Sequence, residues 1–214
     1  MAVRIIDLTR EMRDGMETYP GDVVGMRLDR LARPEAHGFN LSRFAKLSSH
    51  CGTHLDAPLH FVSDGTDVAS LPLRLFPAVV LPAQKKAIGP EAFSQAGPLA
   101  GRAVLLYTGW DARLETPTYY RDAPFLTPEA ARLLVEKGVG LVGIDSPSVD
   151  PFDSRDYPVH RTLLGTGIPF VEGLVRLGEL ARQPGMPYFL ALPLKVKGAE
   201  ASPVRAVALF LDAE

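Results

Sequence analysis

The sequence predicts one mixed α/β domain that spans residues 1–214. Three observations support this fold class. A chain of 214 residues is long enough for one sizeable hydrophobic core. Short apolar runs with the character of strands alternate with a few helical patterns, as in α/β proteins. Proline and glycine, 19 of each, are spread along the whole chain, and no change in composition marks a linker.

Six apolar runs have the length and composition of β-strands. They are Arg4–Leu8, Ala78–Leu81, Ala103–Tyr107, Gly140–Ile144, Tyr188–Leu192 and Ala206–Leu211. Two further segments, Met26–Leu31 and Asn40–Leu47, alternate more loosely between apolar and polar residues. We expect these two segments to pair as a hairpin.

Three helices are predicted. The first is bounded by Thr127, which can cap its N-terminus, by Pro128 at its first position and by Gly138 at its end. The second is expected from Glu172 to Ala181, where leucines recur at helical spacing. A shorter helix is expected over Pro90–Ala96.

The composition argues against several classes of protein. The formal net charge is −2, without the basic excess that a nucleic-acid surface normally shows. No apolar run approaches the roughly 20 residues that a membrane-spanning helix needs. The single cysteine, Cys51, cannot form an intrachain disulfide, and we expect it to be a small buried residue of the core. A cytoplasmic location is the resulting expectation.

Residues 50–60 carry the strongest functional signal in the sequence. They read His-Cys-Gly-Thr-His-Leu-Asp-Ala-Pro-Leu-His, so three of the chain's five histidines lie close to one aspartate. Histidine is the commonest metal ligand and the usual acid or base near neutral pH. Gly52 weakens a helix and Pro58 breaks one, so the segment is predicted to be extended or looped.

An extended segment would bring these side chains together. His54 and Asp56 are two residues apart, so in a strand they share one face. The Gly-Thr step before them can turn the chain so that His50 joins the same group. Pro58 stiffens the exit from the segment and thereby fixes the position of His60.

The grouped residue types suit a divalent metal ion. Imidazole and carboxylate together bind Zn²⁺ and also Mn²⁺ or Fe²⁺. Asp56 has two oxygens and can bridge two ions. Further ligands must come from distant segments, and the candidates are His160, which lies in a loop after a predicted strand, and Glu172. A lone acidic residue in the first turn of a helix is usually only a dipole partner, so Glu172 is the weaker candidate.

Residues 50–61 resemble the signature H-x-G-T-H-x-D-x-P-x-H-F of the metal-dependent cyclase family, which includes bacterial kynurenine formamidases and isatin hydrolases. Every fixed position of the signature matches. The resemblance extends over nearly the full chain through weaker blocks in the expected order. These blocks are Ile6–Thr9, Tyr19–Asp22, Val142–Ser146, Pro158–Leu164 and Glu172–Leu174.

The resemblance implies a mixed α/β fold with a β-barrel-like central sheet flanked by helices, and a homodimer or homotetramer. It also implies a divalent metal centre, with two zinc ions per subunit as the first expectation and manganese as the alternative. The matching positions imply that His50, His54 and Asp56 bind a first metal. Asp56 is then shared with a second metal, which His160 also binds, and Glu172 contacts both. His60 matches the residue that donates and accepts protons.

One position departs from the kynurenine formamidase pattern. In those enzymes a tryptophan that meets the aromatic substrate precedes the Pro-Gly-Asp turn, whereas Tyr19 stands there in this chain. Tyrosine can still stack against an aromatic ring, and it adds a hydroxyl group. The change leaves the metal chemistry untouched and leaves the substrate open.

The predicted function is metal-dependent hydrolysis of a small aromatic amide, a carbon–nitrogen bond other than a peptide bond. The first candidate reaction converts N-formylkynurenine to kynurenine and formate, a step of tryptophan catabolism. A metal would lower the pKa of water from about 15.7 toward about 7, and His60 would carry the proton to the leaving amine. Tyr19, with Phe61 as a candidate neighbour, would form the pocket wall.

Two alternatives use the same residues differently. The same metal site can open isatin or another cyclic amide, because only the pocket would differ. A structural or metal-storage domain is the alternative outside the enzymes. Structural zinc sites usually have four ligands rich in cysteine, so the single cysteine and the additional His60 argue against that alternative.

Overall fold

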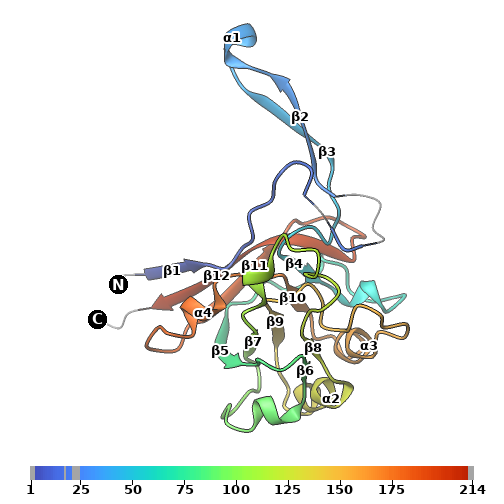
Figure 1. The fold of residues 1–214 in the computed structure, drawn as a ribbon, viewed down its shortest axis with the longest axis vertical. Helices are drawn as coiled ribbons and strands as arrows, with labels where there is room; N and C mark the ends of the chain where they lie inside the picture. Colours follow the sequence, from blue (N-terminus) through green and yellow to red (C-terminus); the bar gives the residue numbers. More distant parts are fainter. Residues whose placement is uncertain (1–2, 17, 21–24, 212–214) are drawn as a thin grey trace.

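A closed ring of strands forms the centre of the structure, a computed structural model that describes residues 3–16, 18–20 and 25–211 (Figure 1). Eight strands form one sheet, and seven of them close because β4 pairs with both β10 and β12. The ring runs through β12 (Ala201–Leu211), β11 (Tyr188–Pro193), β5 (Phe76–Pro82), β7 (Ala103–Tyr107), β9 (Leu141–Ile144), β10 (Phe170–Glu172) and β4 (His54–Asp56). The eighth strand, β1 (Val3–Asp7), pairs only with β12. The expected mixed α/β fold with a barrel-like centre is confirmed.

The strands in the middle of the sheet are parallel and buried on both sides. β5, β7, β9 and β10 pair in parallel, and the ring is completed by antiparallel pairs. Side chains of β7 alternate between two cores, as the period of two along a strand requires. Val104 and Leu106 face a core shared with the helices, whereas Ala103 and Leu105 face a core shared with β12. Such two-sided burial explains the continuous apolar sequence of β7.

Two helices cover the outer face of the parallel strands (Figure 1). They are α2 (Pro128–Glu136) and α3 (Pro158–Gly165), and their buried residues belong to the same core. Thr127 caps α2 as predicted, because its hydroxyl accepts a hydrogen bond from the backbone nitrogen of Ala130 at 3.2 Å. The remaining short elements are β6 (Ala87–Ile88), β8 (Phe125–Leu126), α4 (Leu177–Leu180) and the 3₁₀ turns η1 (Pro58–His60), η2 (Pro90–Phe93) and η3 (Trp110–Arg113).

The predicted helix over Glu172–Ala181 is wrong. Glu172 ends strand β10, Gly173 turns the chain at a φ of 65°, and only Leu177–Leu180 forms a helix, α4. The leucines at helical spacing are all buried in the core shared with β12, but only Leu177 and Leu180 lie in α4, and Leu174 precedes it. The shorter helix expected over Pro90–Ala96 is a 3₁₀ turn over Pro90–Phe93.

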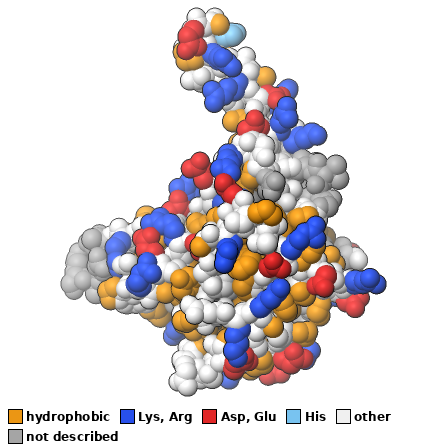
Figure 2. All heavy atoms as spheres, viewed as in Figure 1, with side chains coloured by type: hydrophobic (Ala, Val, Ile, Leu, Met, Phe, Trp, Pro, Cys, Tyr) orange, Lys and Arg blue, Asp and Glu red, His pale blue; other side chains and the backbone are white. Residues whose placement is uncertain are grey.

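The predicted hairpin is confirmed and projects away from the barrel (Figure 1). It consists of β2 (Arg27–Ala32) and β3 (Leu41–Lys46), with the single turn α1 (Pro34–His37) at its tip. Apolar side chains along it are exposed among lysines and arginines (Figure 2). These exposed residues are Leu31, Phe39, Leu41 and Phe44.

The base of the hairpin packs against the functional segment. Cys51 is fully buried there beside Met16 and Met26, with 3.8 Å between its sulfur and that of Met16. The expectation that Cys51 fills space in a core is therefore confirmed. Among the helices that the structure describes, none is long and apolar enough to cross a membrane.

Candidate metal centre

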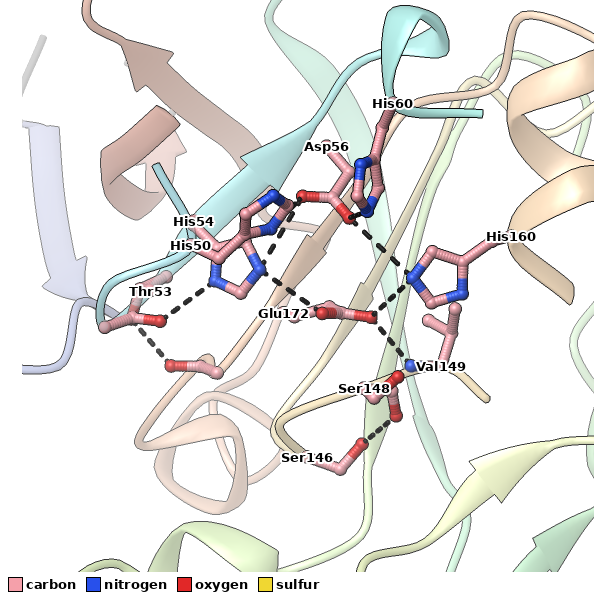
Figure 3. A network of polar contacts seen from close by, with 12 residues as sticks. His50, Thr53, His54, Asp56, His60, Ser146, Ser148, Val149, His160 and Glu172 are labelled. Atoms are coloured by element: carbon pink, nitrogen blue, oxygen red, sulfur yellow. Dashed lines mark hydrogen bonds and ion pairs between the residues drawn. The ribbon is translucent and has the colours of Figure 1, made fainter. Parts of the chain in front are cut away.

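Strand β4 presents two of the predicted ligands on one face, at the point where the ring closes. His54 and Asp56 are separated by one residue, and Glu172 of β10 lies directly across from His54 in the strand register. The Nε2 atom of His54 is 3.3 Å from Oε2 of Glu172 and 3.6 Å from Oδ1 of Asp56 (Figure 3). Sheet pairing therefore brings together residues that are more than a hundred positions apart in the sequence.

The loop before β4 returns His50 to the same group. Gly52 adopts a φ of 69°, a conformation that residues with a side chain rarely adopt. Nδ1 of His50 consequently lies 3.2 Å from Oδ1 of Asp56. The hydroxyl of Thr53 donates a hydrogen bond to the carbonyl oxygen of Gly173 at 2.6 Å, which ties this loop to the residue after Glu172.

Two further histidines approach Asp56 from the other side. His60 follows Pro58 in the turn η1, and its Nε2 is 3.8 Å from Oδ2 of Asp56. His160 lies in α3, with its Nε2 3.8 Å from Oδ2 of Asp56 and 3.9 Å from Oε1 of Glu172 (Figure 3). The structure thus brings all six predicted ligand and proton-transfer residues into one cluster, while the role of each remains a prediction.

Hydrogen bonds behind the cluster orient two of the imidazole rings. Nδ1 of His54 lies 3.1 Å from the carbonyl oxygen of Gly52, and Nδ1 of His160 lies 2.6 Å from Oδ2 of Asp150. A carbonyl oxygen can only accept, so Nδ1 of His54 donates this hydrogen bond and Nε2 is the atom that faces the cluster. Such partners commonly fix the orientation of metal-binding histidines.

Asp150 also fixes the start of helix α3. Its carboxylate accepts hydrogen bonds from the backbone nitrogens of Val159 at 3.1 Å and His160 at 2.9 Å. The same carboxylate therefore holds both the backbone and the imidazole ring of His160. Asp145 accepts hydrogen bonds from the backbone nitrogens of Thr108 and Gly109.

The state of Asp56 indicates that the cluster fits a cation. Both carboxylate oxygens are buried, and neither has a hydrogen-bond partner among the described residues. A buried carboxylate without hydrogen bonds costs several kcal/mol unless a positive charge compensates it. Two sets of donor atoms lie within 4.8 Å of one another around it, namely His50, Asp56 and His60, and His54, Asp56 and Glu172. These donor types suit zinc or manganese.

Charges within the cluster shift the pKa values of its members in opposite directions. Burial alone would lower the pKa of His50, but the nearby Asp56 carboxylate raises it to about 9. Burial would raise the pKa of Asp56, and the surrounding histidines, His50 foremost, instead hold it well below its usual value. A proton on His50 thus supplies the compensating charge in the free protein. Metal binding should release that proton.

His60 differs from the other histidines of the cluster in its electrostatics. Burial lowers its pKa, and the positive charges of His50 and His160 lower it further, although Asp56 opposes the change. His60 is therefore neutral at pH 7 and can accept a proton. By contrast, the hydrogen bond with Asp150 raises the pKa of His160 in spite of its burial.

A cavity of about 340 Å³ opens above the cluster. Its walls are largely aromatic, formed by Tyr19, Phe61, Tyr119, Tyr120 and Tyr157. Tyr19 lies on this wall, as predicted, and its ring centroid is 5.5 Å from that of Phe152 and 5.6 Å from that of Tyr120. The Gly21 and Asp22 positions of the predicted turn lie outside the described residues.

Phe61 lies between the cavity and the hydrophobic core. It lines the cavity, with its ring centroid 4.9 Å from that of His160, and its other side packs against the hydrophobic core. Other residues at the site carried no signal in the sequence, and Arg10, Tyr119 and Glu200 are examples. Each comes from a separate loop, so no motif or spacing connects it with residues 50–60.

Comparison with known proteins agrees with this geometry. The family model described as "Putative cyclase" matches residues 6–151. Kynurenine formamidase from Salinibacter ruber is 37% identical over 209 residues, which cover 95% of this chain and 96% of that protein. The structure of isatin hydrolase A from Labrenzia aggregata superimposes with a TM-score of 0.84 at 26% identity, covering 98% of this chain and 94% of that one.

A further solved structure has a related description. It is a potential metal-dependent hydrolase with cyclase activity, similar with a TM-score of 0.79 and 26% identity over 99% of this chain and all of that one. The sequence match and the shared fold both extend over most of the chain. The chain therefore belongs to the cyclase family.

Proposed function

We propose that the protein is a metal-dependent hydrolase that converts N-formylkynurenine to kynurenine and formate. The observation that carries the proposal is the buried Asp56 carboxylate. It has no hydrogen-bond partner in the described part of the chain, and it lies among four histidines and Glu172 beneath an aromatic cavity. The relative from Salinibacter ruber, 37% identical over nearly the whole chain, is named a kynurenine formamidase. The substrate is a small aromatic amide that suits a cavity of about 340 Å³.

Two zinc ions per subunit, or manganese in their place, would be held by the cluster. His50, His54 and Asp56 would bind one ion, and His160 and Asp56 would bind the other, with Glu172 contacting both. A bound divalent ion supplies a water molecule of lowered pKa and polarises a carbonyl group. The donor atoms of His60, His50 and Asp56 lie within 4.8 Å of one another. An experiment must therefore distinguish proton transfer by His60 from metal binding by His60.

The side chains of the cavity carry out the proton transfers and hold the ring. His60 accepts a proton from water as the water oxygen attacks the formyl carbon. It then donates this proton to the amine nitrogen as the carbon–nitrogen bond breaks, so that formate and the aryl amine leave. Its lowered pKa keeps the imidazole neutral for the first step. Tyr19 would stack against the substrate ring, and burial raises its pKa so that its hydroxyl stays protonated.

We also infer that residues 1–214 act as one domain in a cytoplasmic homodimer or homotetramer. The support is the projecting hairpin, since a two-stranded hairpin alone is only marginally stable in water. Residues 27–46 contain five lysines and arginines and two acidic residues, so the rest of the chain has a net charge of −5 against a total of −2. A basic hairpin with exposed apolar side chains is complementary to the acidic remainder of a second copy.

The test is metal analysis of the purified protein together with turnover of N-formylkynurenine and of isatin at equal concentrations. We expect bound zinc or manganese and a kcat/KM for N-formylkynurenine at least about tenfold above that for isatin. The reverse preference would favour isatin hydrolysis, which the fold of isatin hydrolase A makes the second candidate. Absence of turnover with both compounds would overturn the proposed substrate.

A further inference from the structure

The cavity contains one cationic side chain that the proposed mechanism does not use. Arg10 lines the wall, and among the described lining residues it alone has a permanent positive charge. The two acidic lining residues, Asp56 and Glu172, are directed toward the histidines of the cluster. The charge of Arg10 is thus available to a molecule that occupies the cavity.

The position of Arg10 is fixed from two sides. Its backbone nitrogen donates a hydrogen bond to the hydroxyl of Thr53 at 2.8 Å, which anchors it to the loop that carries the predicted metal ligands. Its guanidinium carbon lies 5.6 Å from the ring centroid of Tyr119, another wall residue. An arginine beside an aromatic ring keeps its planar donors oriented, so less conformational freedom is lost when it binds a ligand.

Arg10 also differs from a neighbouring arginine in its partners. Arg13 forms an ion pair with Glu115 at the surface. Among the described residues, no carboxylate lies within ion-pair distance of the Arg10 guanidinium. The hydrogen bond with Arg13 is the main cause that lowers the pKa of Glu115, and the charge of Arg10 contributes less. Arg10 is a partly buried residue of the cavity wall, and its guanidinium has no carboxylate partner in the described part of the chain. Such a group is suited to bind an anionic group of a ligand.

We propose that Arg10 binds the carboxylate of the substrate and thereby selects aryl formamides that carry an acidic side chain. This inference rests on the proposed function. N-formylkynurenine carries its amino-acid carboxylate at the end of the molecule away from the formamide, whereas isatin is uncharged. Because arginine and a carboxylate pair through two parallel hydrogen bonds, the contact also sets which way the substrate enters.

The experiment compares two pairs of compounds that differ only in the amino-acid group. The first pair is N-formylkynurenine and 2-formamidoacetophenone, whose hydrolysis is followed. The second pair is kynurenine and 2-aminoacetophenone, whose binding is measured by calorimetry. The variant is Arg10→Gln, Arg10→Lys tests partial rescue, and Arg13→Gln is the matched control because Arg13 lies outside the cavity lining.

In Arg10→Gln we expect the KM for N-formylkynurenine and the Kd for kynurenine to rise at least about tenfold, in keeping with the loss of a charged hydrogen bond. The kcat for N-formylkynurenine and the KM and Kd of the two acetophenones should change less than about twofold. Arg10→Lys should recover part of the loss, and Arg13→Gln should match the unmodified protein.

Equal losses with the charged and uncharged compounds would overturn the inference and make Arg10 a structural support of the Thr53 loop. Failure of the unmodified protein to bind kynurenine would also overturn it. A different result would overturn the proposed function without overturning the carboxylate site. If kynurenine binding depends on Arg10 but no formamide is hydrolysed, the carboxylate site stands and the hydrolase proposal is wrong.

Discussion

The four histidines around Asp56 differ in what holds their rings. His54 and His160 each have one nitrogen engaged behind the cluster, by Gly52 and Asp150 respectively. His50 has Glu200 on its outer side, with 3.3 Å between Nε2 and Oε1. Among the described residues His60 has no such partner, and only Asp56 lies within ion-pair distance of its ring. A ring without a fixed tautomer is suited to alternate between accepting and donating a proton.

The His60→Ala variant tests this assignment. We expect kcat to fall by about 10²–10⁴-fold, because proton transfer is lost, while the metal content stays close to that of the unmodified protein. His54→Ala, measured beside it by metal analysis, should lose metal as well as activity. If His60→Ala also lost an equivalent of metal, His60 would be a ligand in the group with His50 and Asp56.

Asp145 gives a pH dependence to stability rather than to catalysis. Burial raises its pKa from 3.8 to about 6, even though Thr108 and Gly109 donate hydrogen bonds to it. The folded state therefore binds this proton more tightly than the unfolded state does. Asp145 therefore stabilises the fold most below about pH 4, where its side chain is protonated. This stabilisation decreases by about 1–3 kcal/mol as the pH rises to about 6.

Denaturant unfolding of the unmodified protein and of Asp145→Asn between pH 4 and pH 8 checks the sign. The free energy of unfolding of the unmodified protein should fall relative to that of Asp145→Asn as the pH rises from 4 to 6. Above pH 6 the difference between the two proteins should be constant. A difference that does not change with pH would show that Asp145 has an ordinary pKa in the fold.

At the scale of elements, the site depends on the short strand β10 and the residue that ends it. Gly173 has a φ of 65°, and a Cβ atom there would lie 2.8 Å from the carbonyl oxygen of Gly52. That contact joins the turn after Glu172 to the loop that carries His50. The two backbones can approach so closely only because Gly173 has no side chain.

Gly173→Ala should lower the free energy of unfolding by more than the about 1–2 kcal/mol expected for the left-handed conformation alone, and it should weaken metal affinity. Gly167→Ala is the matched control, since Gly167 has a φ of 81° and no atom within 4 Å of the added carbon. Denaturant unfolding and a metal titration of both variants make the comparison. Equal losses in the two variants would contradict the proposed close contact.

The errors in the sequence-based prediction also belong to the scale of elements. Helix α2 was predictable because Thr127, Pro128 and Gly138 mark it locally. Helix α3 was not, because its first residues bond to Asp150, several positions upstream, and its N-cap residue Tyr157 has a positive φ. Glu172 was assigned to a helix because the partner that makes it a strand, β4, lies more than a hundred residues away.

At the scale of the whole molecule, paired strands of the sheet hold three residues of the cluster. His54, Asp56 and Glu172 lie on paired strands inside a ring whose cores are apolar. The ligand segment was predictable because its signature is contiguous. Arg10 and the cavity tyrosines other than Tyr19 were not, since the fold alone brings their loops together.

Removal of metal with a chelator should therefore abolish hydrolysis while most of the secondary structure remains. Circular dichroism before and after chelation, with activity restored by added zinc or manganese, checks this expectation. Collapse of the spectrum on chelation would instead favour a structural metal site.

The projecting hairpin leads to a prediction about assembly. Replacing Leu41 and Phe44 with lysine should lower the molar mass measured by light scattering to that of the monomer, because both side chains are exposed and would be buried by a second copy. Met186→Lys, at an equally exposed residue outside the hairpin, is the control. A monomeric unmodified protein would contradict the inferred dimer or tetramer.

The pairing of β4 with β12 has a consequence for synthesis of the chain on the ribosome. The register places Asp56 opposite Ala201 and His54 opposite Pro203, so the ring cannot close until the last strand has left the exit tunnel. Contacts this distant in the sequence form late in folding. A nascent chain therefore carries its signature histidines before the ring around them is closed, because closure waits until residues 201–203 of β12 have emerged.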